Sequence, residues 1–163
     1  MSGAGAPTEE PVDGSGLSVA VVGTRWHPQV TDALVERAVA TVQECGATLG
    51  RVLRVPGAFE LPLAAQALAA SHDAVIALGV IVRGGTPHFD YVCDAVTTGC
   101  TRVALDTGVP VGFGVLTCDT DQQALDRSGL PGSSEDKGRE ATLAAIETAA
   151  LLRDVRGGRR AGF

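Results

Sequence analysis

Long apolar runs, paired cysteines and an excess of basic residues are all missing from this sequence of 163 residues. It has no run of about 18 apolar residues, and its start lacks the basic and apolar regions of a secretion signal. We therefore expect a soluble, unexported protein with no membrane partner. Thirteen Lys and Arg against nineteen Asp and Glu give a net charge of −6. This balance disfavours nucleic acid as a partner, because binding its phosphates needs basic residues.

The cysteines are few and widely spaced, and they form no C-x-x-C pair; they are Cys45, Cys93, Cys100 and Cys118. No two histidines have the spacing of metal ligands, so the sequence predicts no metal site. We interpret the cysteines as reduced, mostly buried thiols of a cytoplasmic protein.

The chain divides into a leader, one domain and a tail. Residues 1–16 mix Gly, Pro, Ser and acids with almost nothing to bury, which predicts a disordered leader. Residues 17–155 have the length of a single domain. Residues 156–163 begin with Arg-Gly-Gly-Arg-Arg and are predicted to form a solvated basic tail.

Short β-rich runs alternate with Ala-rich stretches within the domain. The predicted strands are 17–22, 48–55, 74–82 and 110–117. The predicted helices are 28–45, 61–71, 86–105, 120–127 and a last one ending near 155. This alternation predicts a three-layer α/β/α sandwich around a four-stranded, mainly parallel sheet. Ligands bind such sheets beyond the carboxyl ends of the strands, so the loops there are the first place to look for function.

Cap patterns mark three of the helix starts. Thr86 is predicted as the N-cap of the third long helix, with Pro87 as its first residue. Capping-box patterns at 120–123 and 133–136 precede the last two helices.

The loop after the third strand, Arg83-Gly-Gly-Thr-Pro-His88, is the strongest local signal. Its glycines allow a ligand to approach the backbone, and a helix start favours an anion such as phosphate. A plain tight turn explains the same residues equally well. Arg83, Arg127 and Lys137 are candidate cations, although a solvated charge is the commoner role of a surface cation. His88 adjoins this loop, and we favour proton transfer over capping as its role.

The two preceding loops hold a second group of candidates. Glu60 lies between two prolines, where it can accept hydrogen bonds from a polyol-like ligand or stabilise a helix start. Trp26 is the only tryptophan in a chain with 4% aromatic residues, and it is suited either to stack on a flat heterocycle or to cap the core. His72 is predicted to cap a helix end, and Cys118 has no clear partner that would make it a nucleophile.

Five motifs, in this order, resemble lumazine synthase. They are 55–62 (VPGAFELP), 79–91 (GVIVRGGTPHFDY), 110–117 (PVGFGVLT), 123–127 (QALDR) and 136–138 (DKG), within a resemblance that runs from about 17 to 152. The resemblance implies a flavodoxin-like fold and a transferase of riboflavin biosynthesis. That family condenses 5-amino-6-(D-ribitylamino)uracil with 3,4-dihydroxy-2-butanone 4-phosphate to give 6,7-dimethyl-8-ribityllumazine, phosphate and water. It uses no cofactor and no metal.

The resemblance also implies roles for single residues. His88 is the expected proton donor, and Gly85, Thr86 and Arg127 are expected to bind the phosphate. The residues expected around the pyrimidine and the ribityl chain are Trp26, Ala58, Phe59, Glu60, Val80, Ile81, Val82, Phe113 and Lys137. Two positions depart from the family pattern: Gly85 replaces a residue with a side chain, and His27 stands where Asn is common.

The family further implies an assembly. Its sites lie between adjacent subunits of a homopentamer, with the counterparts of Phe113, Arg127 and Lys137 supplied by the neighbour. Some relatives assemble pentamers into icosahedral cages of 60 subunits. Two other functions compete with the enzyme: a module that holds FMN without turning it over, and a shell subunit that has lost catalysis. The first lacks the Ser/Thr-rich loop it needs at 23–28, and His88, Arg127 and Lys137 argue against the second.

Overall fold

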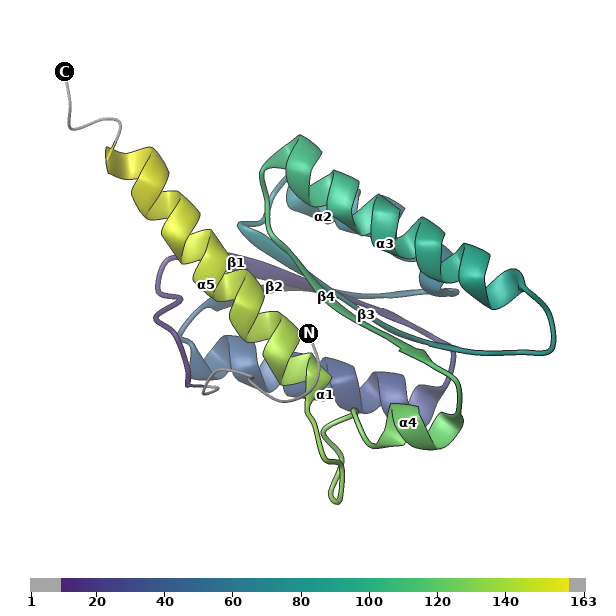
Figure 1. Cartoon of the computed structure of the whole chain (residues 1–163). Coiled ribbons are helices and arrows are strands. Elements are labelled where there is room, and N and C mark those ends of the chain that lie inside the picture. The colour runs from purple at the N-terminus through teal and green to yellow at the C-terminus, as the bar shows by residue number, and fades with distance from the viewer. Residues whose placement is uncertain (1–9, 159–163) are drawn as a thin grey trace.

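Strands and helices alternate along residues 10–158, the part of the chain that the computed structural model describes (Figure 1). The elements are β1 (Ser18–Thr24), α1 (Pro28–Glu44), β2 (Thr48–Val55), the 3-10 turn η1 (Ala58–Glu60), α2 (Leu61–Ala69), β3 (Ala74–Val82), α3 (His88–Thr107), β4 (Val111–Cys118), α4 (Asp121–Leu125) and α5 (Lys137–Gly158). The predicted bounds of β2 and β3 are confirmed to the residue.

The four strands form one parallel sheet in the order β2-β1-β3-β4. Helices α2 and α3 pack together on one face, whereas α1 and α5 pack together on the other (Figure 1). The predicted three-layer α/β/α sandwich is therefore confirmed, and its sheet is parallel throughout.

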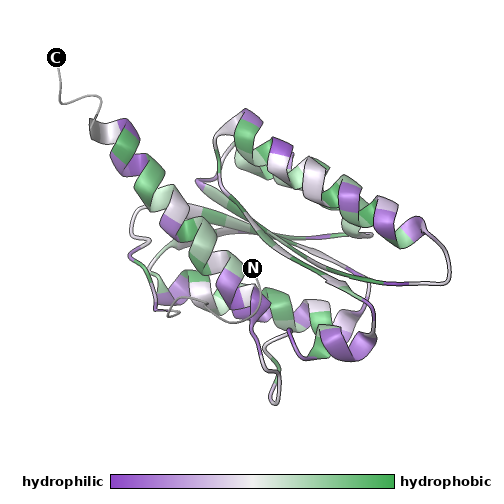
Figure 2. Cartoon of the chain, in the orientation of Figure 1, coloured by the Kyte–Doolittle hydropathy of each residue, from purple (hydrophilic) through white to green (hydrophobic). Residues whose placement is uncertain are grey.

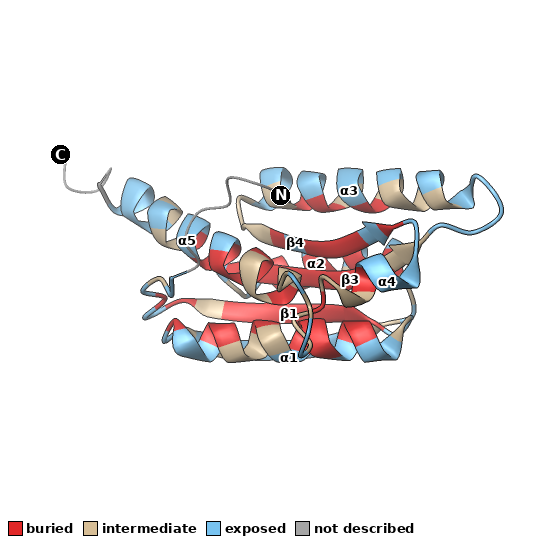
Figure 3. Cartoon of the chain, turned by 60° about the horizontal axis from the view of Figure 1, so that its bottom comes forward, coloured by how far each residue is buried: buried red, intermediate tan, exposed pale blue. Residues whose placement is uncertain are grey.

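The core lies on both faces of β3, whose residues from Ala74 to Val80 are all buried. Ile76 and Leu78 pack towards α1 and α5, and Val75 and Ala77 pack towards α2 and α3. Figure 3 shows the buried residues along the strands and on the sides of α1 and α3 that face the sheet. Hydrophilic and hydrophobic residues alternate along α3, as expected for a helix with one face on a sheet (Figure 2).

Two glycines let α5 approach its neighbours closely. A Cβ added at Gly112 of β4 would lie 2.4 Å from the carbonyl oxygen of Ala141, and one at Gly138 would lie 2.5 Å from that of Leu34. Real Cβ atoms do not approach backbone this closely. Because glycine has no side chain at these two positions, the start of α5 can pack directly against β4 and α1.

The prediction that Thr86 caps α3 is wrong. The helix begins at His88, and Pro87 occupies the cap position without a side-chain hydrogen bond. The Asp90 N–H donates to the Pro87 carbonyl, so the first turn closes one residue later than the cap pattern suggests. His88 is still in the first turn.

The other cap patterns have mixed outcomes. Thr120 does cap α4, since its Oγ1 accepts from the Gln123 N–H at 3.2 Å. At α5 the capping oxygen belongs to Asp136, which accepts from the Arg139 N–H at 2.9 Å, and not to Ser133. Strand β1 also continues to Thr24, two residues beyond its predicted end, because Gly23 and Thr24 pair with β2.

The structure differs from the predicted boundaries of the domain at both of its ends. Of the leader predicted at 1–16, residues 1–9 lie outside the described residues, but Gly14 is buried and its N–H donates to the Cys45 carbonyl at 2.7 Å. Helix α5 continues to Gly158, three residues beyond the predicted domain end at 155, and residues 159–163 lie outside the described part. Between residues 10 and 158, no helix is both long and apolar enough to span a membrane.

Candidate active site

Parallel pairing brings the candidate loops to one edge of the sheet. The last residue of β1, Thr24, pairs with Val55 at the end of β2, and Val82 at the end of β3 pairs with Cys118 at the end of β4. The segments that follow these four residues carry nine of the thirteen predicted site residues, and the other four lie within β3 and β4. This is the edge at which parallel sheets bind ligands.

The loops after β1 and β2 meet beside Gly57. A Cβ added at Gly57 would lie 3.6 Å from Trp26 Nε1, and the Gly57 N–H donates to Glu60 Oε2 at 2.8 Å. Trp26 is 67% exposed and Phe59 is 65% exposed. Trp26 therefore does not cap the core, and its indole is free to stack on a flat ligand. The Glu60 carboxylate closes the turn of η1, and Ala58 is buried beneath it.

The loop after β3 is open to solvent. Gly84, Gly85, Thr86 and His88 are exposed, and a Cβ at either glycine would meet no atom within 4 Å. His88 is the first residue of α3, so its imidazole lies at the positive end of that helix. The first N–H groups of a helix lack intrahelical acceptors, which suits this loop to an anion.

The residues of β3 that lead into this loop become less buried towards its end. Val80 is 4% exposed, whereas Ile81 and Val82 are half-buried. Val80 and Val82 pack on the α1 and α5 face of the sheet, and Ile81 packs on the α2 and α3 face.

Arg83 does not serve as a free cation for this loop. Its Nε donates to Asp119 Oδ1 at 2.8 Å, its Nη1 donates to Asp90 Oδ1 at 3.2 Å, and its Cζ lies 4.1 Å from the centre of the Phe89 ring. The hydrogen bond to Asp119, supported by Asp90, raises the pKa of the guanidinium. Sequence reasoning did not find these two aspartates, because no local pattern links them to Arg83.

Arg127 and Lys137 lie near one carboxylate, that of Glu135. Arg127 Nη2 is 3.6 Å from Glu135 Oε1, and the Lys137 ammonium contacts both Glu135 and Glu140. The hydrogen bond from Lys137 lowers the pKa of Glu135. Partial burial disfavours the charge on Lys137, but the two carboxylates outweigh it and raise the pKa of Lys137.

Among the described residues, Arg127 bonds to residues of its own segment and not to the loop after β3. Arg127 bonds to Gln123 and Glu135, and within residues 10–158 it has no hydrogen bond or ion pair to the loop after β3. Phe113 is 40% exposed in the middle of β4, an edge strand of the sheet.

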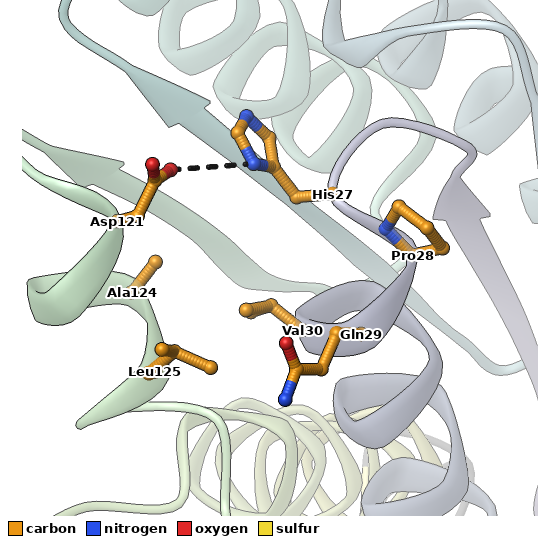
Figure 4. Close-up of a pocket in the computed structure, with 7 residues that line it drawn as sticks. All are labelled: His27, Pro28, Gln29, Val30, Asp121, Ala124 and Leu125. Atoms are coloured by element: carbon orange, nitrogen blue, oxygen red, sulfur yellow. Dashed lines mark ion pairs between the residues drawn. The ribbon is translucent and has the colours of Figure 1, made fainter.

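A hollow of about 420 Å³ lies between the start of α1 and α4 (Figure 4). It is lined by His27, Pro28, Gln29, Val30, Asp121, Ala124 and Leu125. His27 Nδ1 faces Asp121 Oδ1 across it at 3.5 Å. A second hollow of about 340 Å³, lined by Thr24, Arg25, Pro28, Asp32 and Arg54, borders the same loop. Neither hollow includes His88.

Two of the described side chains at this edge could take part in chemistry, the Cys118 thiol and the His88 imidazole. Burial raises the pKa of Cys118, so its thiol is a poor nucleophile. Within the described range, no group of three or more His, Cys, Asp or Glu could hold a metal ion. His88 is exposed at this edge, and proton transfer stays its predicted role.

These features define an α/β-sandwich protein with a candidate site at the carboxyl edge of its sheet. Residues 16–153 match the family model for 6,7-dimethyl-8-ribityllumazine synthase. Curated relatives with that name are 64% identical in Frankia casuarinae, over 95% of this chain and 98% of the relative, and 62% identical in Kineococcus radiotolerans, over 95% and 96%. A relative from Paenarthrobacter aurescens is 58% identical over 94% and 98%. The chain belongs to the 6,7-dimethyl-8-ribityllumazine synthase family.

Proposed function

We propose that this protein condenses 5-amino-6-(D-ribitylamino)uracil with 3,4-dihydroxy-2-butanone 4-phosphate to form 6,7-dimethyl-8-ribityllumazine. The observation that carries the proposal is the family match over 16–153, together with relatives of the same name at up to 64% identity. An exposed His88 beside an open, glycine-containing helix start supports it.

The two substrates are assigned to different parts of the sheet edge. The pyrimidine stacks on Trp26, and the ribityl chain runs past Phe59 and Glu60. Ala58, Val80, Ile81 and Val82 border the same substrate. The phosphate binds the N–H groups at Gly85 and Thr86, where an added side chain at Gly85 would meet nothing.

The neighbouring chain supplies the remaining contacts. We infer a homopentamer in which Phe113, Arg127 and Lys137 of one chain reach the site of the next. Within residues 10–158 Arg127 has no hydrogen bond or ion pair to the loop after β3, which supports this arrangement. So do Leu63, Tyr91 and Leu105, which are 74%, 73% and 78% exposed on α2 and α3, since exposed apolar residues favour subunit contacts.

The reaction needs proton transfers at each step. The free amine of the pyrimidine attacks the ketone carbon, and loss of water leaves a C=N bond. Removal of a proton from the adjacent carbon expels phosphate, and the resulting enol becomes a second ketone. The ribitylamino nitrogen attacks this ketone, and loss of another water closes the ring. His88 moves the protons, Arg127 stabilises the leaving phosphate, and holding both substrates together removes much of the entropic barrier.

One experiment tests both chemistry and assembly. Purified protein is mixed with both substrates while the absorbance of the lumazine is followed, and light scattering gives the mass of the assembly. We expect lumazine and phosphate in equal amounts and a mass of five subunits or a multiple of it. A yellow, inactive sample would favour the FMN module, and an assembled but inactive one would favour the shell subunit.

The free cysteines fit a cytoplasmic location.

A further inference from the structure

Arg83 joins three elements at the sheet edge through one side chain. It follows β3, its guanidinium donates to Asp119 directly after β4, and it also donates to Asp90 in the first turn of α3. Stacking on Phe89 at 4.1 Å holds the guanidinium plane between these partners. A planar fork of donors suits a residue that must fix two carboxylates at once.

Arg83 is linked to the segment of His88 through its own backbone and through Asp90. The Arg83 N–H donates to the Cys118 carbonyl at 2.9 Å, so its backbone is fixed to β4. Its side chain is fixed to Asp90, two residues after His88. Residues 84–87 are therefore held at both ends by Arg83, and with them the direction in which α3 begins.

Arg83 is also linked to Arg127, through Asp119 and Gln123. The Asp119 N–H donates to the Gln123 side-chain oxygen at 2.8 Å, and Arg127 Nη1 donates to the Gln123 carbonyl at 3.0 Å. The carboxylate held by Arg83 thus belongs to the residue that anchors α4. We therefore expect displacement of Asp119 to shift Gln123, and with it Arg127.

We propose that Arg83 is a positioning residue that aligns His88 through Asp90 and Arg127 through Asp119. This inference rests on the proposed function, in which His88 moves protons and Arg127 binds phosphate in an adjacent site. Each Arg83 then aligns parts of two neighbouring sites. Its ion pairs are exposed, and exposed pairs contribute little to stability, so removing Arg83 should alter the site without unfolding the chain.

The test compares substitutions at Arg83 with a matched control. Arg83→Gln should lower kcat about tenfold and raise the KM for the phosphate substrate, because misplaced groups lose rate steeply. Arg83→Lys keeps the charge but not the fork, and should recover only part of the loss. Arg102→Gln, which removes an arginine of α3 that pairs with Asp106 at 3.0 Å, should leave both constants unchanged.

Single substitutions separate the link to His88 from the link to Arg127. Asp90→Asn should lower kcat with little change in KM, and Asp119→Asn should raise the KM for the phosphate substrate. Hydrogen exchange, followed by mass spectrometry on the assembled protein, should become faster at both 84–90 and 119–127 in Arg83→Gln. It should become faster at only one of these segments in each aspartate variant.

Equal kinetics in Arg83→Gln and Arg102→Gln would overturn the proposal, as would unchanged exchange at either segment in Arg83→Gln. An inactive wild-type protein would instead refute the proposed function. The exchange measurement would still test Arg83 in that case, because it needs no substrate.

Discussion

His27 Nδ1 lies 3.5 Å from Asp121 Oδ1, which links the turn after β1 to the first turn of α4 (Figure 4). His27 achieves this in a left-handed conformation, with φ 51° and ψ 61°. It is the only non-glycine residue with positive φ between residues 10 and 158. His27 therefore contributes to the fold in two separate ways, through its contact with Asp121 and through its backbone conformation.

We expect the backbone conformation to matter more for stability than the contact. His27→Val should lower the free energy of unfolding by about 1–2 kcal/mol, because a β-branched residue is strained in this region. His27→Asn should change it by less than about 0.5 kcal/mol, since Asn tolerates this conformation. Denaturant unfolding at one protein concentration measures both. Equal losses in the two variants, matched by Asp121→Asn, would assign the effect to the contact instead.

The Glu135–Lys137 pair predicts how stability depends on pH. Lys137 lowers the pKa of Glu135 below its ordinary value of 4.5, so the pair stabilises the fold above that pH and loses its effect as the pH falls through the lowered value. The raised pKa of Lys137 has the opposite sign: its contribution is complete below 10.5 and is lost as the pH rises beyond it. Glu135→Gln should remove the acid dependence and only weaken the alkaline one, because Glu140 still pairs with Lys137; thermal unfolding across pH measures both. Glu147→Gln, at an exposed position of α5, should change neither.

Close packing at Gly112 predicts a large difference between two glycines. Gly112→Ala should destabilise the protein by about 1–3 kcal/mol, because the added methyl meets the Ala141 carbonyl at 2.4 Å and backbone yields poorly. Gly85→Ala meets nothing within 4 Å and should leave the unfolding temperature unchanged. It should also keep its affinity for phosphate, since the proposed contact is through the N–H. Loss of phosphate binding in Gly85→Ala would show that the loop needs its glycine there.

The strands and layers could be predicted from sequence because their signals are local and redundant. The run of nine residues at 74–82 predicts β3, and it contains no polar side chain that would obscure where the strand begins and ends. Alternation of such runs with helical stretches then predicts the layers. Cap positions were less predictable, because Thr86 and Ser133 match the pattern but the backbone turns elsewhere, at Pro87 and Asp136.

The contacts of the candidate site could be predicted only in part. The loops at the strand ends follow from the parallel sheet, which is why Trp26 and Glu60 come together. The pairing of Arg83 with Asp119 joins residues 36 apart in sequence, and only the register of β3 and β4 places them side by side. Residues near Gly14 are held by its hydrogen bond to Cys45 and by packing of Val12 against the core, neither of which composition reveals.

His88 should contribute to turnover more than to binding. His88→Ala should lower kcat roughly 10- to 100-fold, less than a buried catalytic base would, because water reaches this exposed position and can replace the imidazole in part. The KM for each substrate should change less than about threefold, because a proton-transfer group contributes mainly to the transition state. Steady-state kinetics measures both. Unchanged turnover in an assembled variant would remove His88 from the mechanism.

Trp26 offers a direct report of pyrimidine binding, because it is the only tryptophan of the chain and is 67% exposed. A ring that stacks on the indole removes water from it, so its emission should weaken and shift to shorter wavelength as the pyrimidine is added. Trp26→Ala should weaken pyrimidine binding by about 0.5–1.5 kcal/mol, the worth of an aromatic pair, and Trp26→Phe should keep most of it. Inorganic phosphate alone serves as the control, since its proposed site lies after β3 and away from the indole. An emission change with phosphate but none with the pyrimidine would reverse the assignment of the two substrates to the two parts of the edge.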